Sequence, residues 1–133
     1  MLKLEIVTPE KRVFDGTVDL VTVPTASGEA GILPNHAPMI SALKPGILSY
    51  SNGGSTEKLA IAGGFVEVSS NRVSILTDTA ESAADINTAD AHAEREAAEK
   101  ALAAAASSSV DETEEERTRL ETANVRLQLA AGK

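Results

Sequence analysis

The chain has 133 residues, a formal charge of −8, and neither cysteine nor tryptophan. That length suits one domain, or a small domain with an appendage. The lack of cysteine excludes disulfides, thiolate metal sites and cysteine nucleophiles, and the acidic balance with few aromatic side chains argues against general nucleic-acid binding. No apolar run approaches the ~18 residues of a membrane span. The N-terminus has an acid, Glu5, among its apolar residues, which is not typical of a signal peptide. We therefore expect a soluble protein that associates with a membrane only through a partner.

Composition divides the chain near residues 79–84. All five prolines lie within the first 45 residues, whereas fifteen of the 22 alanines lie after residue 82. Residues 1–82 are rich in Val, Ile and Thr, which favours strands. Residues 83–133 are rich in Ala, Glu and Arg, which favours helices. The sequence therefore predicts a β-sandwich domain over residues 1–82 and a two-helix domain over residues 83–133.

The first part alternates short apolar runs with turn signals, a rhythm typical of a sandwich or barrel. Residues 2–6 alternate apolar and polar side chains, which predicts a strand with one buried face. Asp15-Gly16 predicts a turn, and residues 18–23 predict a strand that Pro24 ends. Over the whole part we expect about eight to ten short strands.

Further turn signals organise the rest of this part. Lys44-Pro45-Gly46 predicts a turn between two strands. Gly63-Gly64 indicates a bulge or a close backbone approach. The expected strands lie at 39–43, 46–50, 59–62, 65–69 and 73–77, with hairpin turns at Asn52-Gly53-Gly54 and Ser70-Asn71.

The second part predicts two antiparallel helices. Asn87 is placed to cap the first helix, with Asp90 as its reciprocal partner. This helix is expected to end near Ala106, before Ser107-Ser108-Ser109.

The second helix is expected to begin at a cap formed by Ser109 or Asp111, answered by Glu112 or Glu114. Its predicted apolar stripe is thin and consists of Leu120, Ala123, Leu127 and Ala130. Because the first helix offers mostly alanine, the hairpin buries little apolar area. We therefore expect a weakly docked, mobile hairpin.

Patterns for catalysis or cofactor binding are few. His36 and His92 lie in different parts of the chain, and neither belongs to a cluster with metal-ligand spacing. We find no phosphate-binding loop, serine elbow or dinucleotide fingerprint. The acids at 111–116 are typical of a solvated helix start. We expect no catalytic site, cofactor or metal in this chain.

Five segments carry a family resemblance. Residues 27–38 read Ser-Gly-Glu-Ala-Gly-Ile-Leu-Pro-Asn-His-Ala-Pro and closely resemble the signature of the epsilon subunit of F-type ATP synthases, the counterpart of the mitochondrial delta subunit. Residues 61–68 and 71–76 are similar to a second block of that family. Val7-Thr8-Pro9-Glu10 and Lys44-Pro45-Gly46 also match it. The resemblance covers the whole chain and is most specific over residues 1–80.

The resemblance implies a β-sandwich of about ten strands followed by an antiparallel α-helical hairpin. It also implies a non-catalytic rotor subunit in the central stalk of a proton-translocating enzyme. In that family the sandwich binds the gamma subunit and the c-ring, coupling ring rotation to the stalk. The helices regulate or inhibit ATP hydrolysis by the alpha/beta catalytic head. We expect a peripheral protein at the cytoplasmic face of a bacterial plasma (inner) membrane, since no transit segment precedes the sandwich.

Individual residues follow from positions in the family pattern. The resemblance assigns the interface with gamma and the c-ring to Glu29, Ile32, Pro34, His36 and Pro38. It assigns regulatory contacts with the catalytic head to Arg117, Arg119 and Arg126. Simpler interpretations stay open: Glu29 as an exposed turn acid, the prolines as residues that shape a loop, and the arginines as members of intrahelical pairs such as Glu115 with Arg119.

One departure from the family concerns nucleotide binding. Some relatives bind ATP on the folded hairpin through an I/L-D-x-x-R-A motif. Here Asn87 stands for the acid and Asp90 for the arginine, so a carboxylate replaces a guanidinium beside the phosphates. Arg126 matches a later basic position, but it stands alone. We expect ATP binding to be weak or absent.

Two other classes of protein are compatible with these residues. One is a stand-alone β-sandwich interaction module with a helical tail, unconnected to any rotary enzyme. The other is an enzyme on a small β fold, which would need convergent polar groups in one pocket. The folded and the extended hairpin both fit the low apolar content of the helices.

Overall fold

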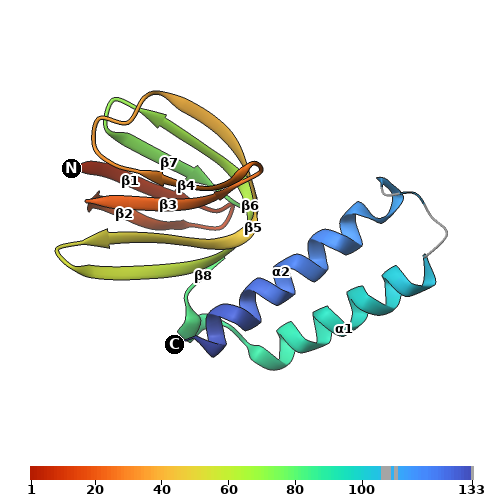
Figure 1. The fold of residues 1–133 in the computed structure, drawn as a ribbon. Coiled ribbons are helices and arrows are strands. Elements are labelled where there is room, and N and C mark those ends of the chain that lie inside the picture. Colours follow the sequence, from red (N-terminus) through yellow and green to blue (C-terminus); the bar gives the residue numbers. More distant parts are fainter. Residues whose placement is uncertain (106–108, 110, 133) are drawn as a thin grey trace.

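A computed structural model describes residues 1–105, 109 and 111–132 of the chain. These residues form a β-sheet domain followed by two antiparallel helices that lie beside it (Figure 1). The expected β-sandwich with a C-terminal helical hairpin is thereby confirmed. The expected helix end at Ala106, and Ser107 and Ser108 after it, lie outside the described residues.

The sheet domain contains eight strands within the described residues. They are β1 (Leu2–Val7), β2 (Arg12–Val18), β3 (Leu20–Thr25), β4 (Gly28–Ile32), β5 (Met39–Asn52), β6 (Ser55–Ser69), β7 (Arg72–Leu76) and β8 (Ala80–Glu81). Hydrogen bonds join them in the order β2-β1-β7-β6-β5-β3-β4, with β8 added to β6. The strands enclose one main core, and β5 and β6 are the longest of them, at 14 and 15 residues.

The core is aliphatic. The alternation predicted for β1 is confirmed, because Leu2, Leu4 and Ile6 are fully buried whereas Lys3 is exposed. Val, Ile and Leu side chains from each of the strands β2 to β7 complete the same cluster.

Two predicted turns are wrong, because the chain continues through them as a strand. Asp15-Gly16 lies inside β2 and Lys44-Pro45-Gly46 lies inside β5. Gly46 serves close packing instead, since a Cβ atom there would lie 2.6 Å from the Cβ atom of Pro24.

The number of strands follows from the same continuity. The runs expected at 39–43 and 46–50 form one strand, as do those at 59–62 and 65–69. Pro24, expected to end a strand, lies inside β3 where the ladder between β3 and β5 shifts register. The eight strands of the described residues therefore lie within the eight to ten expected from the pattern and below the ten or so that the resemblance implied.

The predicted hairpin turns are confirmed. Gly53 and Gly54 have φ of +61° and +89°, and Ser70 and Asn71 have φ of +50° and +62°. Positive φ at both central residues is the requirement of a type I′ two-residue hairpin turn. Gly64 (φ +127°) confirms the expected close approach, because a Cβ atom there would collide with the Leu76 carbonyl group.

The helical part begins with the short 3-10 helix η1 (Ala83–Asp85), followed by α1 (Thr88–Ala104), the 3-10 helix η2 (Asp111–Thr113) and α2 (Glu114–Ala131). The Oδ1 atom of Asn87 accepts a hydrogen bond from the Asp90 amide at 3.0 Å, which confirms Asn87 as the cap. The expected return bond to the Asp90 side chain is not among the hydrogen bonds of the described residues. The Oγ atom of Ser109 accepts one from the Glu112 amide at 3.2 Å and so caps the turn leading into α2.

The hairpin contacts the sandwich through a small apolar cluster. Of the predicted stripe, Ala123 is buried and the other three residues are half-buried. Leu129, which the predicted stripe omitted, is 6% exposed and packs with Ala60 and Ile86. Much of the apolar contact between α2 and the sandwich therefore rests on Leu129.

Candidate interaction surfaces

The segment that carries the family signature combines a buried anchor with exposed side chains. Glu29 is exposed on β4, which lies at one end of the strand path. Ile32 is fully buried in the core. Pro34 and His36 are half-buried, and Pro38 is exposed. Ile32 thus fixes the segment to the sandwich while Glu29 and Pro38 remain accessible.

Between β4 and β5 the chain makes a tight turn over residues 33–36. The His36 amide donates to the Leu33 carbonyl oxygen at 3.2 Å, and Asn35 has a φ of +67°. Nδ1 of His36 donates to the Ala37 carbonyl oxygen at 2.7 Å. The turn leaves the Leu33 side chain 59% exposed.

Three large apolar side chains on the outside of the sandwich form what we call the outer apolar row: Ile40, Phe65 and Leu76, which are 74%, 58% and 58% exposed. Phe65 pairs with Ala42 on one side and with Leu76 on the other, so the row crosses β5, β6 and β7. A shallow groove of about 630 Å³ runs along Ala42, Phe65 and Leu76. Exposed apolar side chains that lie together mark interaction surfaces.

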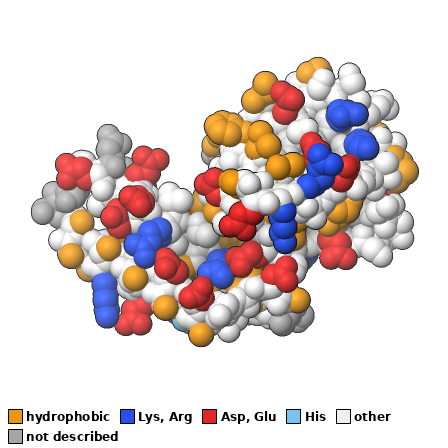
Figure 2. Space-filling view, turned by 180° about the vertical axis from the view of Figure 1, so that it is seen from behind, with side chains coloured by type: hydrophobic (Ala, Val, Ile, Leu, Met, Phe, Trp, Pro, Cys, Tyr) orange, Lys and Arg blue, Asp and Glu red, His pale blue; other side chains and the backbone are white. Residues whose placement is uncertain are grey.

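The outer apolar row adjoins the signature segment. Pro38 and Ile40 line a second shallow groove of about 470 Å³. Figure 2 shows several hydrophobic side chains gathered over the sandwich, whereas acidic side chains predominate over the hairpin. The sandwich thus offers an apolar surface, and the hairpin offers a charged one.

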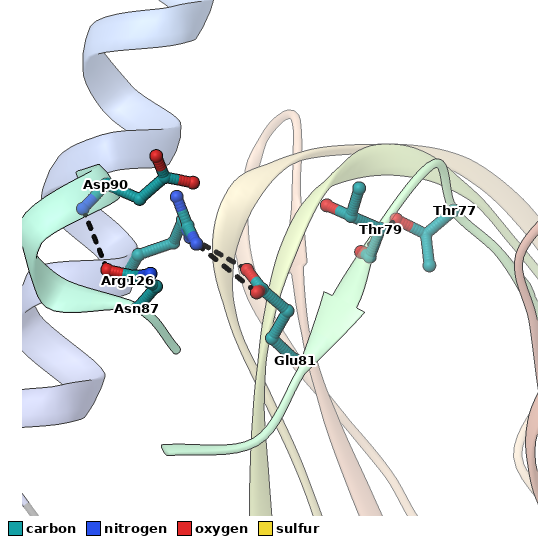
Figure 3. Close-up of polar contacts among 6 residues, drawn as sticks. All are labelled: Thr77, Thr79, Glu81, Asn87, Asp90 and Arg126. Atoms are coloured by element: carbon teal, nitrogen blue, oxygen red, sulfur yellow. Dashed lines mark hydrogen bonds and ion pairs between the residues drawn. The ribbon is translucent and has the colours of Figure 1, made fainter. Parts of the chain in front are cut away.

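Arg126 of α2 ties the hairpin to the sandwich (Figure 3). Its Nε atom donates to Glu81 Oε1 at 2.7 Å, and its Nη2 atom donates to Oε2 at 3.3 Å. The two side chains are only 15% and 27% exposed. Such a two-pronged, partly buried pair is stronger than an exposed ion pair. In this conformation Arg126 is engaged by its own chain.

The other two candidate arginines make separate contacts. Arg119 donates to Glu94 Oε2 of α1 from Nε at 3.2 Å and from Nη2 at 2.9 Å. It therefore pairs across the hairpin and not with Glu115. Nε of Arg117 donates to Thr113 Oγ1 at 3.3 Å, near the start of its own helix.

A groove of about 610 Å³ separates the sandwich from α2. Arg119 and Arg126 both line it, and Arg117 does not. Its basic side chains are outnumbered by acidic ones, three against five: Lys11, Arg119 and Arg126 against Glu10, Asp78, Glu81, Asp85 and Glu94. The acidic majority makes the groove unfavourable for a polyphosphate.

The described part of the chain brings no three His, Cys, Asp or Glu side chains together as a metal site would require. No helix within residues 1–105, 109 and 111–132 is long and apolar enough to cross a bilayer.

A family model for the β-sandwich domain of the ATP synthase delta/epsilon chain matches residues 1–83. The chain belongs to this ATP synthase family. The ATP synthase epsilon chain of Desulforamulus reducens is 49% identical over 100 residues, which cover 75% of this chain and 76% of that one. The epsilon chain of Herpetosiphon aurantiacus is 43% identical over 129 residues, which cover 97% and 93%.

Solved ATP synthase structures contain the same fold, hairpin included. One chain in the mitochondrial ATP synthase of Euglena gracilis (OSCP, F1 and c-ring) aligns with a TM-score of 0.78 at 26% identity, covering 98% of this chain and 81% of that one. A chain in the central stalk and c-ring of the Tetrahymena thermophila enzyme aligns with a TM-score of 0.63 over 97% and 96% of the two chains. At 15% identity, the second match shows the fold alone.

Membership of the delta/epsilon family decides among the classes that the sequence left open. The chain is a non-catalytic subunit of ATP synthase, and neither a stand-alone module nor an enzyme in its own right.

The outer apolar row was missed by the sequence analysis. Phe65 and Leu76 lie in runs that were assigned to strands without regard to which face each side chain occupies. A signal was present, because Phe65 is followed by Val66, and Ile75 by Leu76. Two adjacent apolar residues in a strand occupy opposite faces of the sheet. The strands therefore had apolar side chains on both faces.

Proposed function

We propose that this chain is a rotor subunit of a proton-translocating ATP synthase. Its sandwich, residues 1–82, binds the gamma subunit and the c-ring and couples ring rotation to the stalk. Residues 83–133 form a mobile regulatory domain. The complex places the chain at the cytoplasmic face of a bacterial plasma membrane. The observation that carries the binding role is the outer apolar row beside the signature segment, since nothing in the described chain covers Ile40, Phe65 or Leu76.

A binding titration against the gamma subunit of the same organism tests this role. Phe65→Asp places a charge in the centre of the row, and we expect it to weaken binding at least about thirtyfold, as at an interface hot spot. Thr17→Asp is the matched control, because Thr17 is an exposed strand residue on β2, outside the row. Equal affinity of both variants and the unaltered chain would refute the use of this surface, and no binding by the unaltered chain would refute the role itself.

The signature segment would contact the c-ring and the foot of gamma. Glu29 and Pro38 are accessible for direct contact, while Pro34 and His36 shape the turn and Ile32 anchors it. The variant Glu29→Lys tests whether Glu29 contacts a partner subunit or is only an exposed acid. We expect it to weaken binding to a gamma–c-ring subcomplex, with Glu10→Lys, at another exposed acid, as its control. If the two variants bind equally well, Glu29 is only an exposed acid.

The hairpin would regulate ATP hydrolysis by the alpha/beta catalytic head through Arg117, Arg119 and Arg126. Arg119 pairs with Glu94 inside the hairpin, and Arg126 pairs with Glu81 of the sandwich, so contact with the head requires both pairs to open. Hydrolysis by a reconstituted enzyme tests this role. We expect the double variant Arg119→Glu with Arg126→Glu to change how far the chain inhibits ATP hydrolysis. The control variant Arg95→Glu on α1 should leave that inhibition unchanged. Equal hydrolysis with all chains would exclude the regulatory contact.

ATP binding to the chain itself would be weak or absent. The acidic majority in the groove and the engagement of Arg126 by Glu81 support this. Isothermal titration with ATP is the test, and micromolar affinity would overturn it.

A further inference from the structure

A side chain from a distant part of the sandwich sequence holds the signature turn in place. The backbone amide of Asn35 donates to Asn71 Oδ1 at 2.6 Å, although the two residues lie 36 positions apart. The Nδ2 atom of Asn71 lies 3.5 Å from Asn35 Oδ1, a weak return contact. We propose that Asn71 is a positioning residue that holds residues 33–36 in the conformation required by the interface, a role that rests on the proposed function.

The turn needs such a partner because of its own geometry. With Pro34 second, Asn35 third at positive φ and a hydrogen bond from the fourth residue to the first, residues 33–36 match a type II turn. The turn's own hydrogen bond uses the His36 amide and leaves the Asn35 amide free. Asn71 supplies the acceptor that this amide otherwise lacks.

Asn71 is itself held firmly. It occupies the second central position of the β6–β7 hairpin turn, where its φ of +62° is tolerated by Asn, Asp and Gly. Its carbonyl oxygen accepts a hydrogen bond from the Lys3 amide at 2.8 Å, which ties the hairpin to β1. The same residue thus joins three segments: the first strand, the last tight hairpin and the signature turn.

The consequence concerns how the turn presents its side chains. Leu33 is 59% exposed, and Pro34 and His36 belong to the same turn. A turn held by a hydrogen bond from a second turn keeps these side chains in one arrangement before a partner arrives. A loop that adopts its binding conformation for only a fraction of the time has an apparent affinity reduced by that fraction.

Variants at Asn71 separate the side chain from the turn. Asn71→Gly keeps the positive φ but removes the acceptor, while Asn71→Asp keeps both the φ tolerance and an acceptor oxygen. Ser70→Gly is the matched control, because Ser70 occupies the other central position of the hairpin. The first readout is the hydrogen-exchange rate of the Asn35 amide, measured by NMR in the full chain. The second is affinity for a purified gamma–c-ring subcomplex.

We expect Asn71→Gly to speed exchange of the Asn35 amide about three- to tenfold, the range expected when one hydrogen bond is lost. Affinity for the subcomplex should fall measurably, by a factor no larger than that of the exchange rate. Asn71→Asp should restore both, and Ser70→Gly should change neither.

Unchanged exchange in Asn71→Gly would refute the hold on the turn. Faster exchange with unchanged affinity would refute a role at the interface, as would failure of Asn71→Asp to restore affinity. If the unaltered chain does not bind the subcomplex, the proposed function fails and the interface role of Asn71 fails with it, while the exchange rates still decide whether Asn71 holds the turn.

Discussion

Replacing Glu81 by Gln tests whether one ion pair docks the hairpin on the sandwich. The change keeps the size of the side chain and removes its charge, so it weakens the contact with Arg126 without leaving a cavity. The apolar cluster around Leu129 is small, so the loss should be large relative to the total docking energy.

The structure sets the expected magnitude. Hydrogen bonds to charged groups contribute about 1.5–3 kcal/mol, and exposed ion pairs about 0.2–1 kcal/mol. The Glu81 and Arg126 side chains are 27% and 15% exposed, so solvent still screens part of the interaction. We therefore expect a coupling energy of about 1–2 kcal/mol between them. Glu94 and Arg119 are 50% and 41% exposed, and their coupling should stay below about 0.5 kcal/mol.

A double-mutant cycle with Glu81→Gln and Arg126→Gln measures the coupling in urea denaturation. Both described α-helices belong to the hairpin, so circular dichroism at 222 nm follows that part of the chain. The single tyrosine, Tyr50, lies in β5 and its fluorescence follows the sandwich without interference from tryptophan. The cycle for Glu94→Gln and Arg119→Gln is the internal control.

A coupling energy for Glu81 and Arg126 that is no larger than that of the control cycle would refute this reasoning. So would an equal loss of both couplings at high salt, because partly buried pairs are screened less than exposed ones.

Three further outcomes can be checked by urea denaturation. Gly64→Ala should destabilise the sandwich by more than about 3 kcal/mol, because its Cβ would meet the Leu76 carbonyl at a strained φ, whereas Gly53→Ala, with open space around it, should cost about 1 kcal/mol; equal losses would contradict the packing argument. Burial, and to a smaller extent the Glu57 carboxylate, raises the pKa of Tyr50. As pH rises above about 10, the unfolded chain therefore loses the tyrosine proton before the folded chain does, and the free energy of unfolding falls. Tyr50→Phe should flatten that part of the pH profile, and an unchanged slope would contradict this reasoning. Asn87→Ala should cost about 1 kcal/mol by removing a helix cap, and Asn87→Asp should restore it; no loss in Asn87→Ala would contradict the role of the cap.

Features that depend on near neighbours were predicted correctly. The alternation of β1, the cap formed by Asn87 and the hairpin turn at Ser70-Asn71 each involve residues two or three positions apart. Their physical causes are the two-residue period of a strand, a side chain that reaches the amide three residues on, and tolerance of positive φ. The family signature at residues 27–38 was legible for a similar reason, since it is one continuous segment.

Local signals misled where tertiary packing decides. Pro45-Gly46 is a turn signal by composition, yet the residues continue β5, because Pro45 pairs with Ala62 and Gly46 fits against Pro24. Strand patterns located Phe65 and Leu76 but did not show that both side chains face outward. That outcome follows from a register that sets Phe65 opposite Leu76 on the face away from the core.

By itself the sequence determined the class of fold, the family and the segment that carries the signature. Only the tertiary structure paired Glu81 with Arg126 across 45 positions and Asn35 with Asn71 across 36. The physical reason is distance along the chain. Periodicity, caps and turns act within a few residues, whereas these contacts exist only after the sheet has closed and α2 has docked on it.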